Sequence, residues 1–373
     1  MKKKELNFGI IGSGFMGRTH AFGISIANRV FELPYNLRLK KIADVSDALA
    51  SRAAEELSVP LYTSDWKELV QDSSIDVINI TSPNAFHTEM ALAAIKAGKH
   101  VYCEKPLSTS VTDAKKMCDA AKAAKIKTQV GFNYICNPLL IKARQMIKNG
   151  DLGKIRGFRG IHAEDYMISP DSPFTWRHDP VGGGALADLG SHIIATAEFL
   201  LGPISEVLGT CITSINRRKD SAGIIHNVVT DDVTRAFIKF ENGVSGSIEA
   251  NWIATGRKMQ HDFEIFGSNG SLFFSQERLN ELFFYKNDES EEEKGFKKIV
   301  ASPEHEPYGR FCIAPGHQLG FADLKAIEVK GFVDSIAGLR SEPFNFDQGL
   351  RVQSIVELIR RSSIQSKWLG YTD

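Results

Sequence analysis

The sequence has no excess of charge of either sign and no long apolar run. Its 373 residues include 45 Lys and Arg against 45 Asp and Glu, so the formal net charge is zero. Proteins that coat nucleic acid or anionic membranes usually carry a clear basic excess. No uninterrupted apolar segment approaches the ~20 residues that a helix needs to cross a bilayer. We therefore expect no nucleic acid partner and no membrane attachment.

Cysteine is also scarce. The chain has five cysteines, an odd number, and no two of them form a C-x-x-C pair. Disulfide frameworks use paired cysteines, and cysteine zinc sites use closely spaced ones. We therefore expect neither a disulfide framework nor a metal site, and we expect the protein to be cytoplasmic.

The first third of the chain alternates short apolar runs with helical patterns. The runs are rich in Ile and Val and are bounded by turn residues, which indicates buried strands. Strands are predicted at residues 6–11, 37–45, 75–81, 100–103 and 127–132, and helices at 47–57, 87–97 and 112–125. This alternation predicts an α/β fold over residues 1–133, with the doubly wound parallel sheet of a Rossmann domain.

After residue 133 the pattern changes to strands that are joined by hairpin turns. Glu241-Asn242-Gly243 and Ser268-Asn269-Gly270 each separate two strand-like segments, and Asn-Gly is a strong hairpin signal. We expect residues 134–373 to form an α+β domain with a large, mostly antiparallel open sheet. Helices are predicted at 139–149, 185–201, 323–337 and about 347–365. The last of these is expected to pack back on the first domain.

The open face of this second sheet predicts self-association. Phe237, Phe273 and Phe274 are placed to form an apolar outer face. A large apolar face needs a partner to cover it. We therefore expect a homodimer or homotetramer that associates through the C-terminal sheet.

A glycine-rich turn follows the first predicted strand and opens a helix. The segment Gly12-Ser13-Gly14-Phe15-Met16-Gly17 matches the dinucleotide fingerprint. In that fingerprint the first glycine permits a tight turn, the second lets the pyrophosphate approach, and the third lets the helix pack on its strand. The N-terminus of the helix would hold the phosphates. A purely structural turn is the competing interpretation.

An acidic residue at the end of the second strand would bind the adenosine ribose. Asp44 fits by its position in the strand, although it lies 27 residues after Gly17, whereas about 20 is usual. An inserted loop around residues 29–36 accounts for the excess. Because an acid repels a 2′-phosphate, NAD is favoured over NADP. The basic pair Lys40 and Lys41 leaves NADP open.

Three further segments carry a family resemblance. They are Thr81-Ser82-Pro83-Asn84-Ala85-Phe86-His87, Glu104-Lys105-Pro106, and Gly182-Gly183-Gly184 with Asp188 and His192 on the helix that follows. Together with the glycine turn they resemble the Gfo/Idh/MocA family, the glucose-fructose oxidoreductase and inositol dehydrogenase relatives. The stretch from Tyr166 to Arg177 and the segment Pro315-Gly316-His317 resemble its levoglucosan dehydrogenase-like branch.

The chemistry of Lys105 agrees with this resemblance. Oxidation of a carbinol needs a nicotinamide to receive hydride and a positioned group to take the hydroxyl proton. Lys105 follows the strand predicted at 100–103, at the carboxyl edge where parallel sheets bind ligands. Burial and the nicotinium charge would both lower its pKa. The resemblance implies that the Lys105-Pro106 peptide is cis.

Asp188 and His192 are four residues apart on a predicted helix and so share one face. Histidine can relay a proton near neutral pH, and a carboxylate can orient a hydroxyl or an imidazole. By resemblance, Lys105 and His192 are the acid/base residues and Asp188 is their orienting partner. A histidine that is merely satisfied within the helix is the competing interpretation of His192.

Other positions follow from the resemblance. The cofactor is expected to border Thr81, Ser82, Pro83, Asn84, His87, Glu104, Lys105 and Asn133. The substrate is expected to meet Tyr134, Tyr166, Trp176, Arg177, His317, Lys105, Asp188 and His192. Several alternatives stay open. His87 could cap a helix, Tyr134 could be a core residue, Trp176 could anchor a structural loop, and Arg177 could contact the cofactor.

These expectations favour an NAD-dependent dehydrogenase that oxidises a secondary alcohol of a sugar, anhydrosugar or cyclitol. A glycosidase that uses bound NAD for transient oxidation and elimination is an alternative with the same fold. A regulator that senses a nucleotide or sugar is another, although retention of Lys105, Asp188 and His192 weighs against it. The sequence does not identify the substrate, because the shape of the pocket determines it.

Overall fold

A computed structural model describes residues 3–340 and 344–371, and their packing forms two compact units. Unit 1 comprises Met1–Cys136 and Gly320–Leu350, and unit 2 comprises Asn137–Leu319 and Arg351–Asp373. This grouping differs from a single division at residue 133. The reason is that helix α8 packs against helix α1 of unit 1, where a Cβ on Gly23 would lie only 2.7 Å from Cγ of Lys325.

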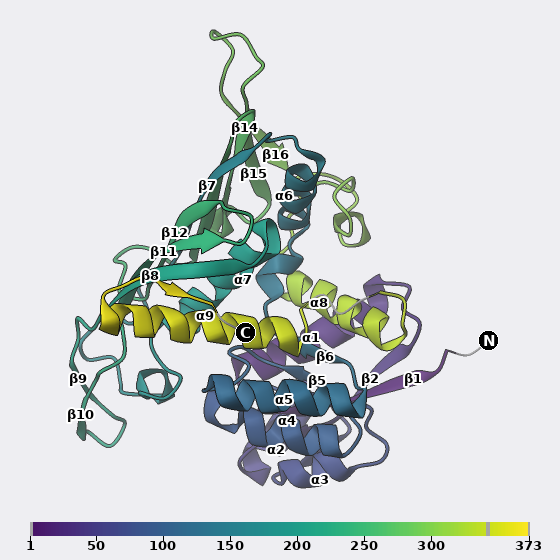
Figure 1. Cartoon of the computed structure of the whole chain (residues 1–373). Coiled ribbons are helices and arrows are strands. Elements are labelled where there is room, and N and C mark those ends of the chain that lie inside the picture. Colours follow the sequence, from purple (N-terminus) through teal and green to yellow (C-terminus); the bar gives the residue numbers. More distant parts are fainter. Residues whose placement is uncertain (1–2, 341–343, 372–373) are drawn as a thin grey trace. The chain divides into compact units, whose positions relative to one another are not determined.

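Unit 1 contains a six-stranded sheet in the order β3-β2-β1-β4-β5-β6, with every pair parallel. Strands β1, β2, β5 and β6 of this sheet are labelled in Figure 1. Its strands are β1 (Glu5–Ile11), β2 (Asn36–Ala43), β3 (Leu61–Thr63), β4 (Val77–Ile80), β5 (His100–Cys103) and β6 (Thr128–Val130). The chain reverses its winding direction between β1 and β4, which is where such sheets bind ligands. The predicted doubly wound Rossmann sheet is confirmed.

Except for α3, the helices of unit 1 begin and end close to where the sequence predicts. They are α1 (Phe15–Val30), α2 (Asp47–Glu56), α3 (Trp66–Gln71), α4 (His87–Lys96), α5 (Val111–Ala124) and α8 (Phe321–Ile336). Serine caps explain two of the starts: Ser46 accepts from the N–H of Leu49, and Ser110 accepts from that of Asp113. The sequence did not predict β3 and α3, which have only three and six residues.

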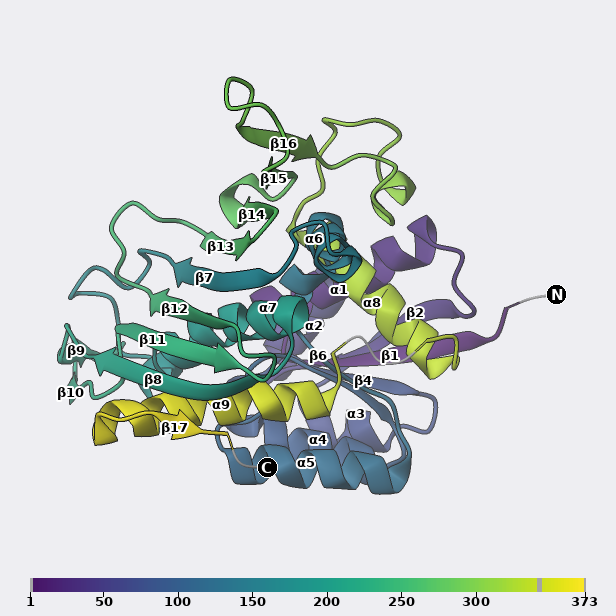
Figure 2. The same ribbon diagram turned by 45° about the horizontal axis from the view of Figure 1, so that its top comes forward.

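Unit 2 contains a nine-stranded sheet in the order β16-β15-β14-β13-β7-β12-β11-β8-β17 (Figure 2). Its strands are β7 (Ile155–Ala163), β8 (Ile204–Ile212), β11 (Val233–Phe240), β12 (Ser245–Asn251), β13 (Gln260–Gly267), β14 (Gly270–Ser275), β15 (Glu281–Lys286), β16 (Phe296–Val300) and β17 (Leu369–Gly370), and a separate hairpin pairs β9 (Arg217–Lys219) with β10 (Ile225–Asn227). Among the described strands of this nine-stranded sheet, only β7 and β12 pair in parallel. The predicted, mostly antiparallel second sheet is confirmed.

The proposed apolar outer face is only partly present. Phe237 is 61% exposed, and Phe273 is partly buried, but Phe274 is fully buried. Successive side chains of a strand point to opposite faces of the sheet, so the neighbours Phe273 and Phe274 cannot share one face. The inclusion of Phe274 was wrong, and self-association through this sheet stays a prediction.

Three longer helices complete unit 2, namely α6 (Pro138–Asn149), α7 (Ser191–Leu201) and α9 (Phe346–Gln365). The division between the units falls within α9. The N–H of Phe346 donates to Thr128 of β6 at 3.2 Å, whereas Ile359 lies against Gly209 of β8. Among the described residues, no helix is long and apolar enough to cross a membrane.

Candidate active site

The glycine turn between β1 and α1 is closed by close backbone contacts. Gly12 has a φ of +99°, which side chains rarely adopt, and a Cβ on Gly17 would lie 2.0 Å from the Gly12 carbonyl oxygen. The Thr81 hydroxyl, which follows β4, donates to the carbonyls of Gly12 at 2.7 Å and Ile11 at 3.0 Å. Thr81 therefore braces the turn, and both glycines are required by its shape.

The outer side of this turn suits a dinucleotide. A Cβ on Gly14 would meet no atom within 4 Å, so the backbone is open to a ligand there. Gly14 begins α1 without any side-chain cap, and the first turn of α1 has no acidic residue. Phe15 and Met16 occupy this first turn, and Phe15 is exposed. The N–H groups at the start of α1 thus fit a pyrophosphate.

Asp44 lies beside the glycine turn, just after β2 ends at Ala43 rather than within the strand. One of its carboxylate oxygens accepts from both the N–H and the hydroxyl of Ser13, and the other accepts from the N–H of Val45 at 2.7 Å. This fixed carboxylate fits a ribose diol and opposes a 2′-phosphate. Lys41, which left NADP open, is buried and paired with Glu68.

The loops after β4 and β5 are tied together by His87, which begins α4. The ring is fully buried, with Nδ1 at 2.9 Å from the Pro106 carbonyl and Nε2 at 2.9 Å from the Ser82 carbonyl. Burial lowers the pKa of His87, although both carbonyls oppose this shift. Both ring nitrogens therefore contact the loops after β4 and β5, and the predicted cofactor contact of His87 stays a prediction.

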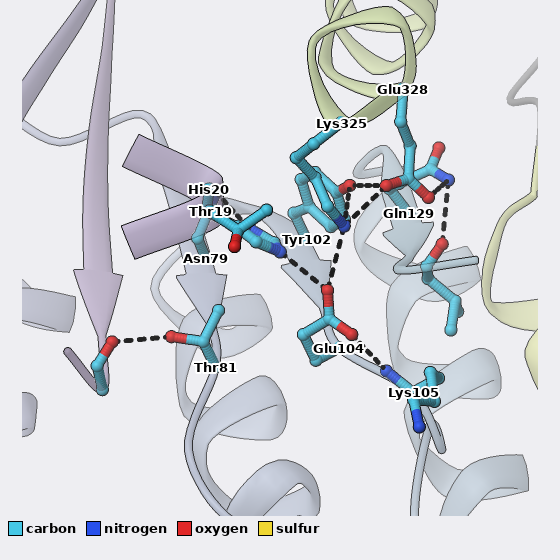
Figure 3. A network of polar contacts seen from close by, with 12 residues as sticks. Thr19, His20, Asn79, Thr81, Tyr102, Glu104, Lys105, Gln129, Lys325 and Glu328 are labelled. Atoms are coloured by element: carbon cyan, nitrogen blue, oxygen red, sulfur yellow. Dashed lines mark hydrogen bonds and ion pairs between the residues drawn. The ribbon is translucent and has the colours of Figure 1, made fainter. Parts of the chain in front are cut away.

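Lys105 follows β5 and forms a cis peptide with Pro106, as the resemblance implies. Its neighbour Glu104 is 5% exposed and points back into unit 1 (Figure 3). The Glu104 carboxylate accepts from the N–H of Lys105 at 3.2 Å. Glu104 therefore faces the interior of unit 1, where its carboxylate holds the backbone of Lys105.

The remaining predicted cofactor residues of unit 1 differ in exposure. Pro83 is exposed and Asn84 is partly buried on the short helix Asn84–Phe86. Asn133, on the short helix Asn133–Cys136, is buried, and its amide nitrogen has no hydrogen-bond partner among the described residues. Such a buried donor fits a ligand amide. Tyr134 is buried, with its ring 6.1 Å from that of Phe321, which agrees with the core interpretation.

In unit 2, Asp188 and His192 do not lie on one regular α-helix. Asp188 belongs to a π-helical turn at Leu186–Gly190, and His192 to α7, which continues from it. A π turn is wider than an α turn, so the predicted i to i+4 face is only approximate here. Single π turns are frequent at functional sites, and this one contains the predicted orienting residue.

The Asp188 carboxylate is held by two predicted substrate residues. Tyr166 donates its hydroxyl to Oδ2 at 2.8 Å, and Arg177 donates its Nε–H to the same oxygen at 3.1 Å. The Arg177 guanidinium also lies 4.3 Å from the ring centre of Trp176, which is 41% exposed. Tyr166, Trp176, Arg177 and Asp188 therefore form one cluster in unit 2.

His192 lies in a group of buried imidazoles. Its ring centre is 5.4 Å from that of His162 and 6.4 Å from that of His261. His162 contacts the Leu189 carbonyl through Nδ1 at 3.1 Å and the Glu164 carboxylate through Nε2 at 3.2 Å. Among the described residues, no group of three or more such side chains is arranged to hold a metal ion.

The start of this helical segment depends on Asp231, which the sequence analysis missed. Its carboxylate accepts from the N–H of Leu186 at 2.7 Å, and its carbonyl accepts from the N–H of Ala185 at 2.8 Å. A Cβ on Gly184 would lie 2.2 Å from the same carboxylate, which explains one of the three glycines. The only sequence signal for Asp231 was that the acidic pair Asp231-Asp232 directly precedes strand β11.

His317 is not joined to this cluster. It is exposed in the segment between β16 and α8. Its substrate role stays a prediction.

Comparison with known proteins supports both units. Residues 6–132 match the oxidoreductase family with an NAD-binding Rossmann fold, and residues 140–273 match the GFO/IDH/MocA C-terminal domain. Levoglucosan dehydrogenase from Pseudarthrobacter phenanthrenivorans is 35% identical over 98% of both chains. Myo-inositol 2-dehydrogenase from Thermotoga maritima is 27% identical over 87% of this chain and 97% of that protein.

Solved structures agree with these matches. An NAD binding oxidoreductase from Klebsiella pneumoniae is 39% identical, with a TM-score of 0.93 over 99% of both chains. A levoglucosan dehydrogenase in complex with NADH and levoglucosan is 35% identical, with a TM-score of 0.95 over 99% of this chain and 100% of that one. The resemblance of the motifs is confirmed, and the chain belongs to the Gfo/Idh/MocA family of NAD-binding oxidoreductases.

Proposed function

We propose that this oxidoreductase oxidises a secondary alcohol of an anhydrosugar, sugar or cyclitol with NAD. The observation that carries the proposal is the likeness to levoglucosan dehydrogenase, which extends over 98% of both chains. An anhydrosugar is therefore the first substrate to test. The Rossmann domain at residues 1–133 would hold the cofactor, and the second domain would supply the substrate surface. Cytoplasmic residence and self-association remain part of the proposal.

Lys105 and His192 are the proposed acid/base residues. NAD, when bound, accepts the hydride from the carbinol carbon, so the alcohol becomes a ketone and one proton is released. Lys105 would take that proton from the hydroxyl, because it follows β5 at the carboxyl edge of the sheet. His192 would relay it, and its partly exposed neighbour Asp188 would orient the substrate hydroxyl.

The cluster in unit 2 supports this role of Asp188. Two donors, Tyr166 and Arg177, converge on a single oxygen of the carboxylate, which favours its ionised form. A charged, fixed carboxylate accepts a hydroxyl hydrogen bond well. The exposed ring of Trp176 beside it offers an apolar surface for the face of a sugar ring.

The test is a panel of polyols assayed by the absorbance of NADH. Levoglucosan, L-sorbose, myo-inositol and scyllo-inositol are each incubated with the enzyme, with NAD and NADP in parallel. We expect NADH to accumulate with at least one of them, and NADPH to form more slowly when NADP replaces NAD. Cleavage of a glycoside without net NADH would instead identify the glycosidase mechanism, and no turnover by any member would contradict the proposal.

A further inference from the structure

A cluster of buried charged groups lies in unit 1 directly behind the Glu104-Lys105 segment (Figure 3). It contains Glu104, Lys325 and Glu328, together with Tyr102 and His20. Glu104 is 5% exposed, Glu328 is 1% exposed, and the other three are fully buried. Charged side chains are almost never fully buried unless they are paired. This cluster therefore needs an explanation that the overall packing does not provide.

Lys325 is the centre of the cluster. It belongs to α8, and its ammonium nitrogen lies 3.0 Å from Oε1 of Glu104. The same nitrogen lies 2.7 Å from Oε2 of Glu328 and 3.1 Å from the hydroxyl of Tyr102. An ammonium group has three donors, and these three acceptors use all of them. The orientation of Lys325 is thus fully determined by its neighbours.

The carboxylate of Glu104 is held on both oxygens. Besides Lys325, Oε1 accepts from His20 Nε2 at 2.8 Å, while Oε2 accepts from the N–H of Lys105 at 3.2 Å. A Cβ on Gly131 would lie 2.3 Å from Oε1, so the Glu104 carboxylate packs directly against the Gly131 backbone, where no side chain would fit. Because one carboxylate joins both contacts, the position of the Lys105 backbone depends on Lys325.

Lys325 supplies the positive charge that faces both carboxylates of the cluster. Burial alone would raise the pKa of Glu104, but the Lys325 ammonium and the His20 hydrogen bond outweigh it and hold that pKa well below its usual range. Burial and the Lys325 charge lower the pKa of His20 to about 4, so His20 is a neutral donor at pH 7. Glu104 is therefore ionised throughout the neutral range.

We propose that Lys325 is a positioning residue for Lys105, and that it acts by keeping the Glu104 carboxylate ionised and bonded to the Lys105 N–H. The inference rests on the proposed function, in which Lys105 moves the proton. It adds a residue from the second half of the sequence to the catalytic machinery. Lys325 touches neither substrate nor cofactor in this role.

A purely structural role would predict a different result. Replacing a buried ion pair by apolar side chains often leaves stability unchanged, because the cost of removing two charges from water offsets their attraction. Loss of Lys325 alone leaves Glu104 buried beside Glu328 without a counter-charge. The pKa of Glu104 must then rise, so that it takes up a proton within the range of an ordinary assay.

Several other titratable groups face Glu104 or its partners. They are His20 on α1, His87 on α4, Tyr102 and Cys103 on β5, Lys105 after β5, Cys136, and Lys325 and Glu328 on α8. Burial raises the pKa of Tyr102, Cys103 and Glu328 and lowers that of His87. Loss of Lys325 also removes the positive charge that lowers the pKa of His20 and of Glu328. A new titration in Lys325→Met therefore belongs to Glu104 if adding Glu104→Gln abolishes it.

The experiment compares Lys325→Met with Lys330→Met, using the polyol that the panel identifies. Lys330 lies on the same helix and pairs with Asp334 at 2.5 Å, but it is partly exposed and outside the cluster. In Lys325→Met we expect kcat at pH 7 to fall by about 10- to 100-fold, as for a small misplacement of a catalytic group. The Kd of NADH should change by less than about threefold, and the control should match wild type.

The pH profile separates positioning from simple damage. In Lys325→Met the loss of kcat should be greatest at low pH, where Glu104 is protonated, and should shrink as pH rises and the carboxylate forms again. Wild type and Lys330→Met should lack this titration. A wild-type kcat and profile in Lys325→Met, or an equal loss at every pH, would overturn the proposal.

A second variant keeps the test valid if Lys325→Met does not fold. Glu104→Gln removes one of the two buried carboxylates, so the double variant with Lys325→Met retains only Glu328, whose pKa burial already raises. If Lys325 acts through Glu104, the double variant should have the kcat of Glu104→Gln within about threefold, because effects within one network are not additive. A further fall of tenfold or more would overturn the proposal.

The outcomes also distinguish this inference from the proposed function. If Lys105→Met keeps wild-type turnover, the assignment of Lys105 fails, and this inference fails with it. If Lys105→Met loses turnover but Lys325→Met behaves as wild type, the proposed function stands and the inference alone is refuted.

Discussion

The open side of the glycine turn makes a specific prediction for Gly14→Ala. Gly14 has a φ of −64°, which alanine also adopts, and an added Cβ would meet no protein atom within 4 Å. Alanine is a poorer residue than glycine at a helix N-cap, by roughly 1 kcal/mol or less. Alanine also reduces the conformational entropy of the unfolded chain, which stabilises the folded protein by about 0.4 to 1 kcal/mol. These effects oppose each other, so the free energy of unfolding should hardly change.

Cofactor binding should respond quite differently. The added methyl group would occupy the surface that the pyrophosphate approaches at the start of α1. We expect the Kd of NADH to rise at least about tenfold, which is about 1.4 kcal/mol. Fluorescence titration with NADH and urea unfolding measure the two quantities on the same sample. Gly295→Ala is a suitable control, because a Cβ there also meets nothing within 4 Å and Gly295 lies between β15 and β16 of unit 2, outside the Rossmann domain.

The comparison has a clear negative outcome. Wild-type affinity for NADH in Gly14→Ala would show that the turn does not hold the pyrophosphate. Gly17→Ala provides the opposite case, since its Cβ would lie 2.0 Å from a backbone oxygen. That variant should lose both stability and NADH affinity, although alanine is the better helix former by about 1 kcal/mol.

Three further predictions concern the cofactor, the substrate and pH. Asp44→Ala should weaken NAD binding more than NADP binding, because the Ser13-anchored carboxylate opposes a 2′-phosphate; equal weakening in titrations would remove its ribose role. Tyr166→Phe deletes one of the donors to Asp188 and should lower kcat/KM about tenfold, the effect of a lost hydrogen bond to a charged group; an unchanged value would show that the hydroxyl is dispensable. Burial lowers the pKa of both His20 and His178 from 6.5 to about 4, so the unfolded chain binds more protons between these values. The free energy of unfolding should therefore fall as pH is lowered from 6.5 to 4, and a flat urea-unfolding profile would contradict this.

The sequence predicted the Rossmann sheet and its ligand loop well, because both depend on local patterns. Gly12 and Gly17 follow a strand directly, and their spacing reflects contacts within one turn. The cis peptide at Lys105-Pro106 followed from resemblance alone. The end of β2 was placed two residues too late, since apolar residues continue through Val45 although the strand ends at Ala43.

The sequence did not predict what depends on distant parts of the chain. Tyr102 and Glu328 are 226 residues apart, and no local pattern indicates that α8 completes the first unit. The only sequence signal for the buried cluster was that Lys325 and Glu328 lie in an otherwise apolar segment. They are three residues apart and so share one helix face. Likewise, the π turn at Asp188 looks like an ordinary helix in the sequence, and its cap Asp231 is 45 residues from Leu186.

The role of Lys105 is tested most directly by measuring NADH production and NADH affinity together in Lys105→Met. With the best substrate of the polyol panel, we predict that turnover falls by roughly 100- to 10,000-fold, the usual contribution of a positioned acid/base group. The Kd of NADH should stay close to that of wild type, because the glycine turn and Asp44 are unchanged. Wild-type turnover by Lys105→Met would contradict the proposed mechanism.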